Sequence, residues 1–534
     1  MTASSRWTLS RPSLTTALVW SLTPAFASAC GIGNEVDMGR LTLSGGVGGQ
    51  GGTGGCGGKA CADFKGKRTF VEPSAMGAAP DTFDTAPVNP PGTDASLEPA
   101  LIYPSHETMF PINLSGLRFS WSGAESSLFA LDFKGTKTDV RVITADSFWT
   151  PDETEWDWVA ESNRGGDVTV VIHALGSELP VQVWSSPSVT LSFSREPVDG
   201  AIYYWSTGSQ GVMKARLADQ NAEEFYTDTD GVDPAICAGS HALSRDGKRM
   251  AACYGGLLRE ISVPERQVLL PVNGGTAGGI DPITGKAIPA DKTTPPAAWT
   301  TFSPDGSRLL VAAAGKLTLL DANTGMPVGP EAGVVSLPPE TPLATHPDWS
   351  ADGEKIAVTL AGKGGDKSTE GGSIALLPYN AGNFGPPDVI VPNQGGTDNN
   401  FFPSFSPDSR FVAYVNASGK SEGAKSASLR LIDLASRKVI ELVRLNQRVN
   451  AQDGAMNLGN SMPSWAPSIT AGTLWLAFTS TRPYAELGPL DAKQAQIWIS
   501  AIDSSRSDPS FAAFWAPFQG IEQDNERAFW TVAP

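Results

Sequence analysis

The pattern of apolar and polar positions between Thr300 and Gly325 predicts three short strands in succession. The first ends at Phe302, and Pro304-Asp305-Gly306 then provides a tight turn, because proline presets φ, aspartate caps the turn and glycine accepts a positive φ. The run Leu309–Ala313 is continuously apolar, which is typical of a strand buried on both faces, and Leu317–Leu320 follows as a third strand. One such unit cannot bury both of its faces, so the pattern predicts neighbours of the same kind.

Variants of this unit recur along the last two thirds of the chain, and their turn aspartates lie 47 to 59 residues apart. The six predicted blade starts are Leu191–Ser194, Ala242–Gly247, Phe302–Gly306, Asp348–Gly353, Ser404–Ser409 and Ser464–Pro467. Repeats of this length that hold several strands each predict a β-propeller rather than a helical solenoid. We therefore predict an all-β protein with a six-bladed propeller over residues 189–534.

The runs FSPDGSRLL and FSPDSRFVAYV resemble the WD40-like (PD40) repeat of the TolB-type six-bladed propeller family. The resemblance covers about residues 189–534. It implies a fold shared by protein-binding components of periplasmic assemblies and by accessory domains of peptidases, so it does not decide the function. The segments before the propeller are a departure from the pattern of that family.

Residues 98–188 alternate apolar and polar positions in several short stretches, among them Gly116–Trp121, Leu128–Phe133 and Asp167–His173. A short helix is predicted between them, with Thr150 as its cap and Pro151 at its first position. The pattern resembles a small immunoglobulin-like or fibronectin-III-like β-sandwich. Residues 30–97 are rich in Gly and Pro and lack apolar periodicity, which predicts a disordered tether.

The first 29 residues have the features of an export signal, with two basic residues followed by an apolar stretch. Ala27-Ser28-Ala29-Cys30 resembles a bacterial lipobox, in which Cys30 is lipidated, although Ala27 replaces the usual Leu and plain secretion stays open. The signal predicts a lipoprotein anchored in the cell envelope, on the periplasmic or the surface face of the outer membrane. Four cysteines then remain as disulfide candidates in an oxidising compartment: Cys56, Cys61, Cys237 and Cys253.

The formal net charge is −17. Such a charge opposes nucleic-acid phosphates and anionic lipid headgroups, so we expect no nucleic-acid partner and no membrane contact other than the lipid anchor.

Two equivalent positions of the blade starts have simple structural interpretations. The aromatic or apolar position is expected to pack between blades: Phe193, Leu243, Phe302, Trp349, Phe405 and Trp465. The preceding position holds small or polar residues suited to the central axis: Ser192, Ala242, Thr301, Asp348, Ser404 and Ser464. Polar residues at or before these strands are candidates for binding at a mouth of the channel, with ordinary turn residues as the alternative: His346, Asp348, Asn399, Asn400, Asn457 and Asn460.

Signals for cofactors and catalysis are weak. Cys237-Ala238-Gly239-Ser240-His241 resembles a haem-attachment motif that lacks its second cysteine, so we expect no haem. Asp228, Asp230 and Asp233 offer oxygen ligands for calcium but lack the distal Glu of an EF-hand loop. Gly419–Gly423 matches G-x-S-x-G without the strand–turn–helix that a nucleophile elbow needs.

Three hypotheses follow from the sequence. The first is a non-catalytic envelope lipoprotein whose propeller binds another envelope protein or a surface polymer. The second is a propeller enzyme, a hydrolase or lyase that uses His346 or Asp348 at the channel mouth. The third is a relic redox protein descended from a carrier of c-type haem.

Overall fold

The computed structural model describes residues 64–533 except 95, 124–125, 127, 177–179, 228–237, 255–256, 271–296, 365–367, 448–457 and 485–493. Several predicted features lie outside these residues: the export signal, Cys30, Cys56, Cys61, Cys237, Asp228, Asp230, Asp233 and Asn457. Cys253 lies in a strand, whereas the other three disulfide candidates are among the residues not described. Within the described ranges, no helix has the length and apolar character that crossing a membrane requires.

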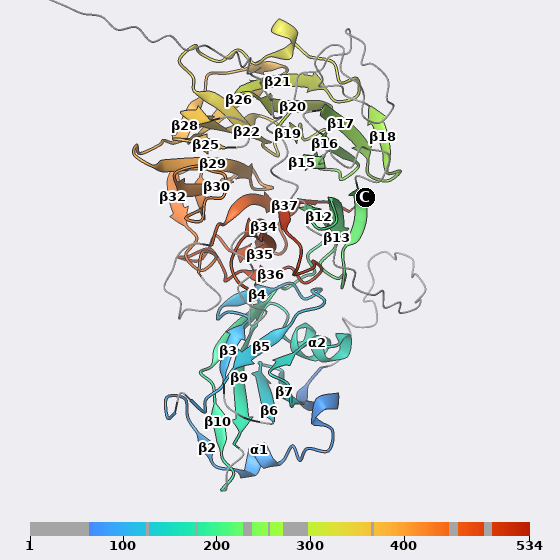
Figure 1. Cartoon of the computed structure of the whole chain (residues 1–534), viewed down its shortest axis with the longest axis vertical. Coiled ribbons are helices and arrows are strands. Elements are labelled where there is room, and N and C mark those ends of the chain that lie inside the picture. The colour runs from blue at the N-terminus through green and yellow to red at the C-terminus, as the bar shows by residue number, and fades with distance from the viewer. Residues whose placement is uncertain are drawn as a thin grey trace, which may run out of the picture.

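Six β-sheets follow one another around the upper part of the molecule, from green through yellow to red in Figure 1, and confirm the predicted six-bladed propeller. The first three blades are built from these strands: β12 (Ala201–Ser206), β13 (Gly211–Ala215), β14 (Glu223–Thr227) and β37 (Asn525–Thr531); β15 (Ala238–Leu243), β16 (Arg249–Tyr254), β17 (Leu257–Ser262) and β18 (Gln267–Leu270); β19 (Trp299–Phe302), β20 (Arg308–Ala313) and β21 (Lys316–Asp321).

The other three blades have the same antiparallel order, with the innermost strand first in the chain. They consist of these strands: β22 (Leu343–Trp349), β23 (Lys355–Ala361), β26 (Ser373–Asn380), β27 (Asn383–Phe384) and β28 (Asp388–Val391); β29 (Asp398–Phe405), β30 (Phe411–Ser418), β31 (Ser428–Asp433) and β32 (Lys438–Glu441); β33 (Ser461–Trp465), β34 (Leu474–Ser480), β35 (Gln496–Ile502) and β36 (Phe514–Trp515). A small hairpin of β24 (Lys363–Gly364) and β25 (Thr369–Glu370) extends from the fourth blade.

The C-terminal strand closes the ring. β37 pairs with β12, with Phe529 opposite Tyr203, and so supplies the innermost strand of the first blade. Gly200 precedes β12 with φ 115°, and a Cβ there would lie 2.7 Å from the carbonyl oxygen of Thr531. Only glycine therefore lets the two strands approach so closely.

The prediction that the first blade starts at Leu191–Ser194 is wrong. β11 (Val189–Phe193) pairs with β9 (Asp167–Leu175) and β4 (Thr108–Phe110) of the N-terminal module. Phe193 contacts Trp156 there at a ring-centroid distance of 5.6 Å. Apolar and polar residues alternate along a strand of a sandwich in the same way as along the first strand of a blade. The pattern therefore does not distinguish the two. The propeller thus begins near Ala201, and Phe193 and Ser192 have no role in it.

The blade turns are built by a repeated hydrogen-bond set. In four blades a buried serine donates its Oγ–H to the turn aspartate, at 2.5–2.6 Å, and accepts the N–H of the residue that starts the next strand, at 2.9–3.0 Å. The serine–aspartate pairs are Ser244 and Asp246, Ser303 and Asp305, Ser350 and Asp352, and Ser406 and Asp408. These bonds satisfy the polar groups of a turn that packs against buried strands.

The N-terminal module consists of two sheets that face each other across an aromatic core, where Phe119 and Phe133 lie 5.3 Å apart. The larger sheet holds β1 (Gly66–Val71), β2 (Val88–Asn89), β4 (Thr108–Phe110), β6 (Phe129–Lys134), β7 (Thr138–Thr144), β9 (Asp167–Leu175), β10 (Val183–Ser185) and β11. The smaller sheet holds β3 (Ala100–Tyr103), β5 (Phe119–Ser122) and β8 (Phe148–Trp149). The assignment to immunoglobulin-like or fibronectin-III-like modules stays a prediction.

The helix α2 (Glu153–Val159) begins later than predicted. Asp152, not Thr150, is its cap, since Asp152 and Glu155 form a reciprocal capping box. Short helical turns complete the module: η1 (Pro73–Ala75), α1 (Thr82–Thr85) and η2 (Glu161–Asn163). A fourth short turn, η3 (Glu331–Gly333), lies in the propeller.

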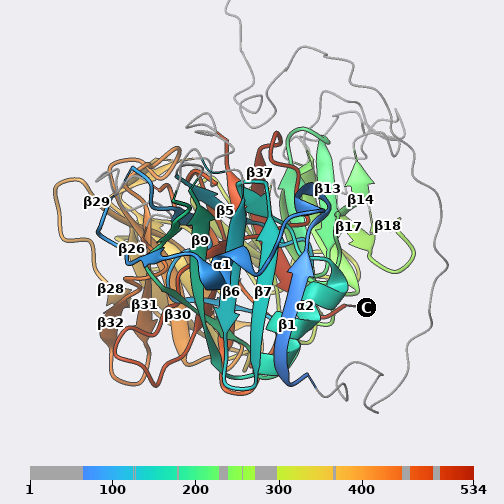
Figure 2. The ribbon, with the colours of Figure 1, turned by 90° about the horizontal axis from the view of Figure 1, so that it is seen from below.

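The predicted end of the tether at residue 97 is also wrong. β1 pairs in parallel with β7 over six residues, and Phe83 of α1 is buried against the larger sheet. Figure 2 shows β1 beside β7 and β6 at the edge of this sheet. β1 is an exposed edge strand of mostly polar residues, so its sequence carries little apolar signal.

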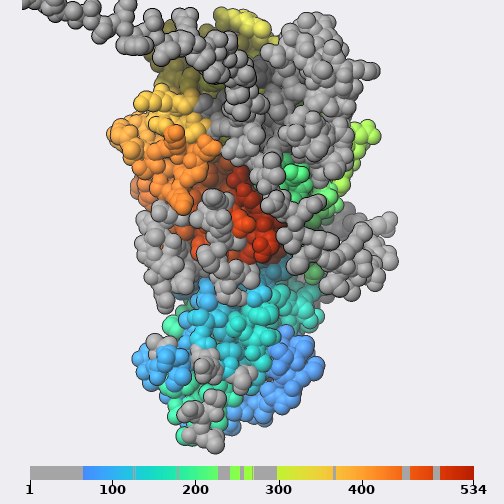
Figure 3. Space-filling view, in the orientation of Figure 1, coloured from blue at the N-terminus to red at the C-terminus, as the bar shows by residue number. Residues whose placement is uncertain are grey.

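The module packs against the sixth blade, as Figure 3 shows where cyan meets red. Tyr103 accepts a hydrogen bond at its Oη from the N–H of Trp515, at 3.0 Å, and Phe110 contacts Phe514 at 5.3 Å. Glu107 forms an ion pair with Arg444 of the propeller. One apolar cluster therefore runs from the module into the propeller and joins the two parts.

Candidate functional site

The innermost strands carry a shared irregularity that aims side chains at the propeller axis. The register of β15, β22, β29, β33 and β37 with the adjacent strand shifts at equivalent places, which marks a β-bulge in each of these five strands. His346, Phe402, Met462 and Arg527 occupy this position with φ between 49° and 53°. Such a conformation costs a residue other than glycine about 1–3 kcal/mol, and bulges commonly redirect side chains next to binding sites.

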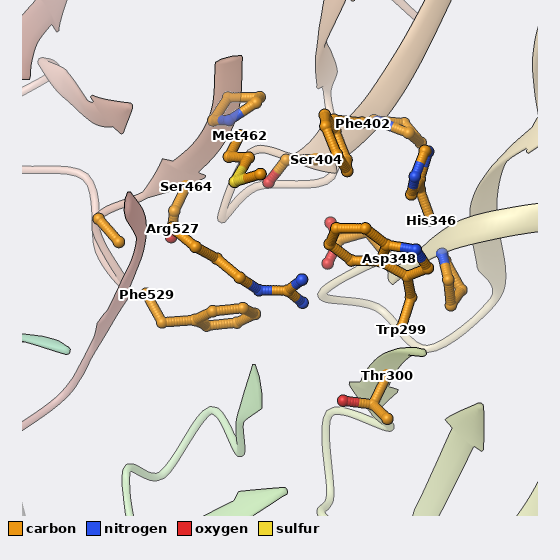
Figure 4. Close-up of a pocket in the computed structure, with 14 residues that line it drawn as sticks. Trp299, Thr300, His346, Asp348, Phe402, Ser404, Met462, Ser464, Arg527 and Phe529 are labelled. Carbon is orange, nitrogen blue, oxygen red and sulfur yellow. The ribbon is translucent and has the colours of Figure 1, made fainter. Parts of the chain in front are cut away.

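These side chains line a cavity in the central channel (Figure 4), here called the upper chamber. Its wall is formed by the following residues: Trp299, Thr300, His346, Pro347, Asp348, Phe402, Pro403, Ser404, Met462, Pro463, Ser464, Arg527, Ala528 and Phe529.

Aromatic rings and one guanidinium dominate the upper chamber. His346 packs between Trp299 and Phe402, at ring-centroid distances of 4.7 and 4.0 Å. The guanidinium of Arg527 points toward Trp299, with its Cζ 4.4 Å from the ring centroid (Figure 4). A cation held over an aromatic face is a common element of ligand recognition.

His346 is buried, and its Nδ1 lies 3.2 Å from the hydroxyl of Thr359. Its Nε2 has no hydrogen-bond partner within the described part of the chain. Burial and the nearby Arg527 guanidinium hold the pKa of His346 well below its ordinary value, so the ring is neutral. A buried ring nitrogen without a partner is costly unless a ligand or water meets it.

Asp348 lies at the base of the upper chamber. Burial raises its pKa to about 6, whereas a hydrogen bond from the N–H of Phe405 to Oδ2, at 2.6 Å, and the charge of Arg245 favour the ionised form. Thr301 and Ser464 form equivalent hydrogen bonds to a neighbouring blade through their hydroxyl groups. The hydroxyl of Thr301 accepts the N–H of Trp349 at 3.2 Å, and that of Ser464 accepts the N–H of Trp530 at 3.1 Å. The position before the inter-blade aromatic thus links neighbouring blades, and only one of these three links uses a charge.

The predicted asparagine candidates do not line the upper chamber. Asn399 and Asn400 lie in β29 rather than in a loop, and both are buried. Asn399 bonds to Thr369, Gly372 and Gly419. Asn460 bonds to Asn446 and Arg482. Asn400 bonds to Gly372, Asp398 and Asn416. All three side chains therefore join neighbouring segments of the propeller, which is a structural role.

Of the other predicted candidates, two line the upper chamber and His241 does not. His346 and Asp348 both lie in β22 and line the chamber, but each is hydrogen-bonded to another residue. His241 of the haem-like motif is buried in β15, with Nε2 3.3 Å from the carbonyl oxygen of Tyr203. Burial lowers its pKa to about 3. Among the described residues, no three His, Cys, Asp or Glu side chains are grouped so that they could hold a metal ion.

Trp299, Phe402, Met462, Arg527 and Phe529 were not identified from the sequence. A signal existed, since a proline follows the bulged residue in three blades, at Pro347, Pro403 and Pro463. Comparison of the third position before each inter-blade aromatic would have placed Trp299, His346, Phe402 and Met462 together. Arg527 and Phe529 also required the recognition that the C-terminal strand completes the first blade.

The sequence matches no protein-family model and no curated protein. Among solved structures, TolB from Acinetobacter baumannii is 12% identical, with 70% of this chain and 81% of that chain covered and a TM-score of 0.37. A TolB candidate from Agrobacterium tumefaciens is 13% identical, with 63% and 99% covered and a TM-score of 0.32.

Hydrazine synthase from Kuenenia stuttgartiensis is 14% identical, with 50% of this chain and 62% of that chain covered and a TM-score of 0.30. These values are too low to carry a functional argument. The assignment of a six-bladed propeller rests on the order and closure of the six sheets described above.

Proposed function

We propose that this chain is a non-catalytic binding module of the bacterial cell envelope and that its upper chamber holds part of another protein or of a surface polymer. The observation that carries the proposal is the convergence of bulged residues from several blades on one open cavity. A propeller does not need large side chains in left-handed conformations to close its ring, so their cost supports a role in binding.

The chemistry of the wall narrows the ligand class. Arg527 favours an anionic group, and the rings of Trp299, Phe402 and Phe529 favour an apolar or planar group beside it. The unpartnered Nε2 of neutral His346 is suited to accept or donate one hydrogen bond, depending on its tautomer. A protein segment or polymer that bears a carboxylate next to an apolar group has these properties.

The cellular setting is part of the same proposal. Export by the first 29 residues and lipidation at Cys30 would place the propeller in the envelope, at the end of a Gly-rich segment. Replacement of Cys30 by Ser is expected to release the mature protein from the membrane fraction. Fractionation of cells that express each form measures this, and retention of the variant in the membrane would contradict lipid anchoring.

The binding role is tested by affinity capture from envelope extracts with purified wild type and with Arg527→Gln and Trp299→Leu variants. Both changes are expected to reduce recovery of the bound component at least tenfold. Arg437→Gln is the matched control, because Arg437 is an exposed cation that pairs with Asp388 on the outer edge of the propeller. Recovery that is equal for all four proteins would refute the proposal.

The rival hypothesis of a hydrolase or lyase draws on the raised pKa of Asp348, since a carboxyl group with a pKa of about 6 is suited to acid–base chemistry. The hydrogen bonds of the site favour binding instead, because His346 and Asp348 contact Thr359 and Phe405 rather than each other. Hydrolytic or lyase activity that is lost in both Asp348→Asn and His346→Ala would establish the rival.

A further inference from the structure

A second cavity opens at the other end of the channel and is here called the lower chamber. It shares Asp348, Ser404, Ser464 and Phe529 with the upper chamber, so these four residues form a girdle between the two. Apolar and aromatic residues from all the blades contribute to its wall, together with the polar residues Ser244, Thr301 and Thr531. The apolar and aromatic residues include Leu243, Phe302, Trp349, Phe405, Trp465 and Trp530.

Arg245 is a charged residue in this wall that the fold does not require. It follows Ser244 in the blade turn, where the equivalent turns place Pro304, Ala351 or Pro407 after the serine. Its guanidinium reaches past the third blade to the fourth, where one nitrogen donates to the carbonyl oxygen of Trp349, at 3.2 Å. The turn would close equally well with proline or alanine at this place.

Asp348 is the second charged residue that the fold does not require. Its hydrogen bond from the N–H of Phe405 is equivalent to the hydrogen bonds that the hydroxyls of Thr301 and Ser464 accept, so a neutral acceptor would be enough. Arg245 and Asp348 attract each other through space, but these two described side chains form no ion pair within 4.0 Å. Asp352 also attracts Arg245, and its own hydrogen bonds go to Ser350, Glu354 and Ser409.

Opposite charges that face one cavity without direct pairing match a ligand that carries both charges. We infer that the lower chamber is a binding site for a small zwitterion of amino-acid size. Its carboxylate would meet the guanidinium of Arg245, and its primary ammonium group would meet the carboxylate of Asp348. The aromatic and apolar part of the wall would hold the side chain of the ligand.

Isothermal titration calorimetry on the purified protein tests the inference with glycine, L-leucine and L-phenylalanine. The matched probes are acetate, 4-methylpentanoate and 3-phenylpropionate, which lack the ammonium group. At least one amino acid is expected to bind, and its deaminated analogue is expected to bind at least tenfold more weakly. Binding of the analogue with equal affinity would overturn the zwitterion assignment, as would the absence of binding by all three amino acids at millimolar concentration.

Arg245→Ala and Asp348→Ser reproduce residues that other blades use at the same places, so both variants are expected to fold. Each is expected to weaken binding of the amino acid at least tenfold. Asp348→Asn replaces Asp348→Ser if the latter does not fold. Arg527→Gln changes only the upper chamber and is expected to leave amino-acid binding unchanged, which separates this site from the proposed function. Binding that is insensitive to both lower-chamber variants would overturn the inference.

Discussion

Two regions of each innermost strand can be compared from blade to blade: the turn that follows the strand and the bulge that faces the channel. The residue types of the turns are repeated, whereas those of the bulges are not. The serine–aspartate hydrogen bonds of the turns recur in four blades with almost identical lengths. The bulges instead carry a histidine, a phenylalanine, a methionine and an arginine in one backbone conformation. The repeated residues therefore build the blade, whereas the residues that differ from blade to blade give the channel its chemistry.

The largest expected difference between the two regions is in pH dependence. His241 lies beside the upper chamber, and its pKa of about 3 is below the ordinary value of 6.5. The unfolded chain therefore binds a proton there before the folded protein does, so stability is complete above pH 6.5 and falls by up to about 1.4 kcal/mol per pH unit below it. Between pH 7 and pH 5, the melting temperature is expected to fall less for His241→Phe than for wild type. An equal fall in both proteins would contradict this.

The turn aspartates affect the stability of the protein at a lower pH than His241 does. Hydrogen bonds to Ser303 and Ser307 hold the pKa of Asp305 below its ordinary value of 3.8. Its contribution to stability is present above pH 3.8 and is lost as the pH falls below it. Asp305→Asn is therefore expected to match the wild-type pH dependence between pH 7 and pH 5, and a difference in that range would contradict the distinction between turn and channel.

A paired substitution in the fifth blade compares the two regions directly. Ser406→Ala removes the buried hydroxyl that donates to Asp408 and accepts from Phe411, which is expected to cost about 1–3 kcal/mol. Ser404→Ala, two residues earlier and facing the channel, is expected to cost less than about 0.5 kcal/mol. Urea unfolding of both variants measures this, and equal losses would show that the girdle is as structural as the turn.

The smallest expected effect concerns the backbone of the bulge. Met462 has φ 49°, and asparagine adopts this conformation more readily than methionine. Met462→Asn is therefore expected to raise the unfolding free energy by about 0.5 kcal/mol. A loss of more than about 1 kcal/mol would show that packing of the thioether, rather than ligand binding, explains the conformation.

The repeated part of the molecule could be predicted from the sequence, because its residue types are set by local physics. The Pro-Asp-Gly turn after Phe302 and the apolar run Leu309–Ala313 led directly to the third blade. The same logic failed at Leu191–Ser194, since alternation does not tell to which sheet a strand belongs. The contribution of β37 to the first blade requires contacts between the two ends of the propeller segment, which no local pattern encodes.

The candidate site was harder to predict for a related reason. His346 and Asp348 were identified because they are unusual in their strand, but the asparagines are equally polar and prove to be structural. Arg527 and Trp299 meet only after the ring closes, and their residue types do not repeat. Arg245 follows the serine of a turn in which other blades place proline or alanine, so only the comparison of blades reveals it.

Site-specific photo-crosslinking in cells tests the central claim most directly, because it does not require the ligand to be known. A photoreactive phenylalanine derivative at Phe402 is expected to yield a discrete adduct that disappears when Arg527 is replaced by Gln. The same derivative at Phe148, an exposed ring on the N-terminal module, is expected to yield none. The absence of an adduct at position 402, or an adduct that persists without Arg527, would contradict a binding site in the upper chamber.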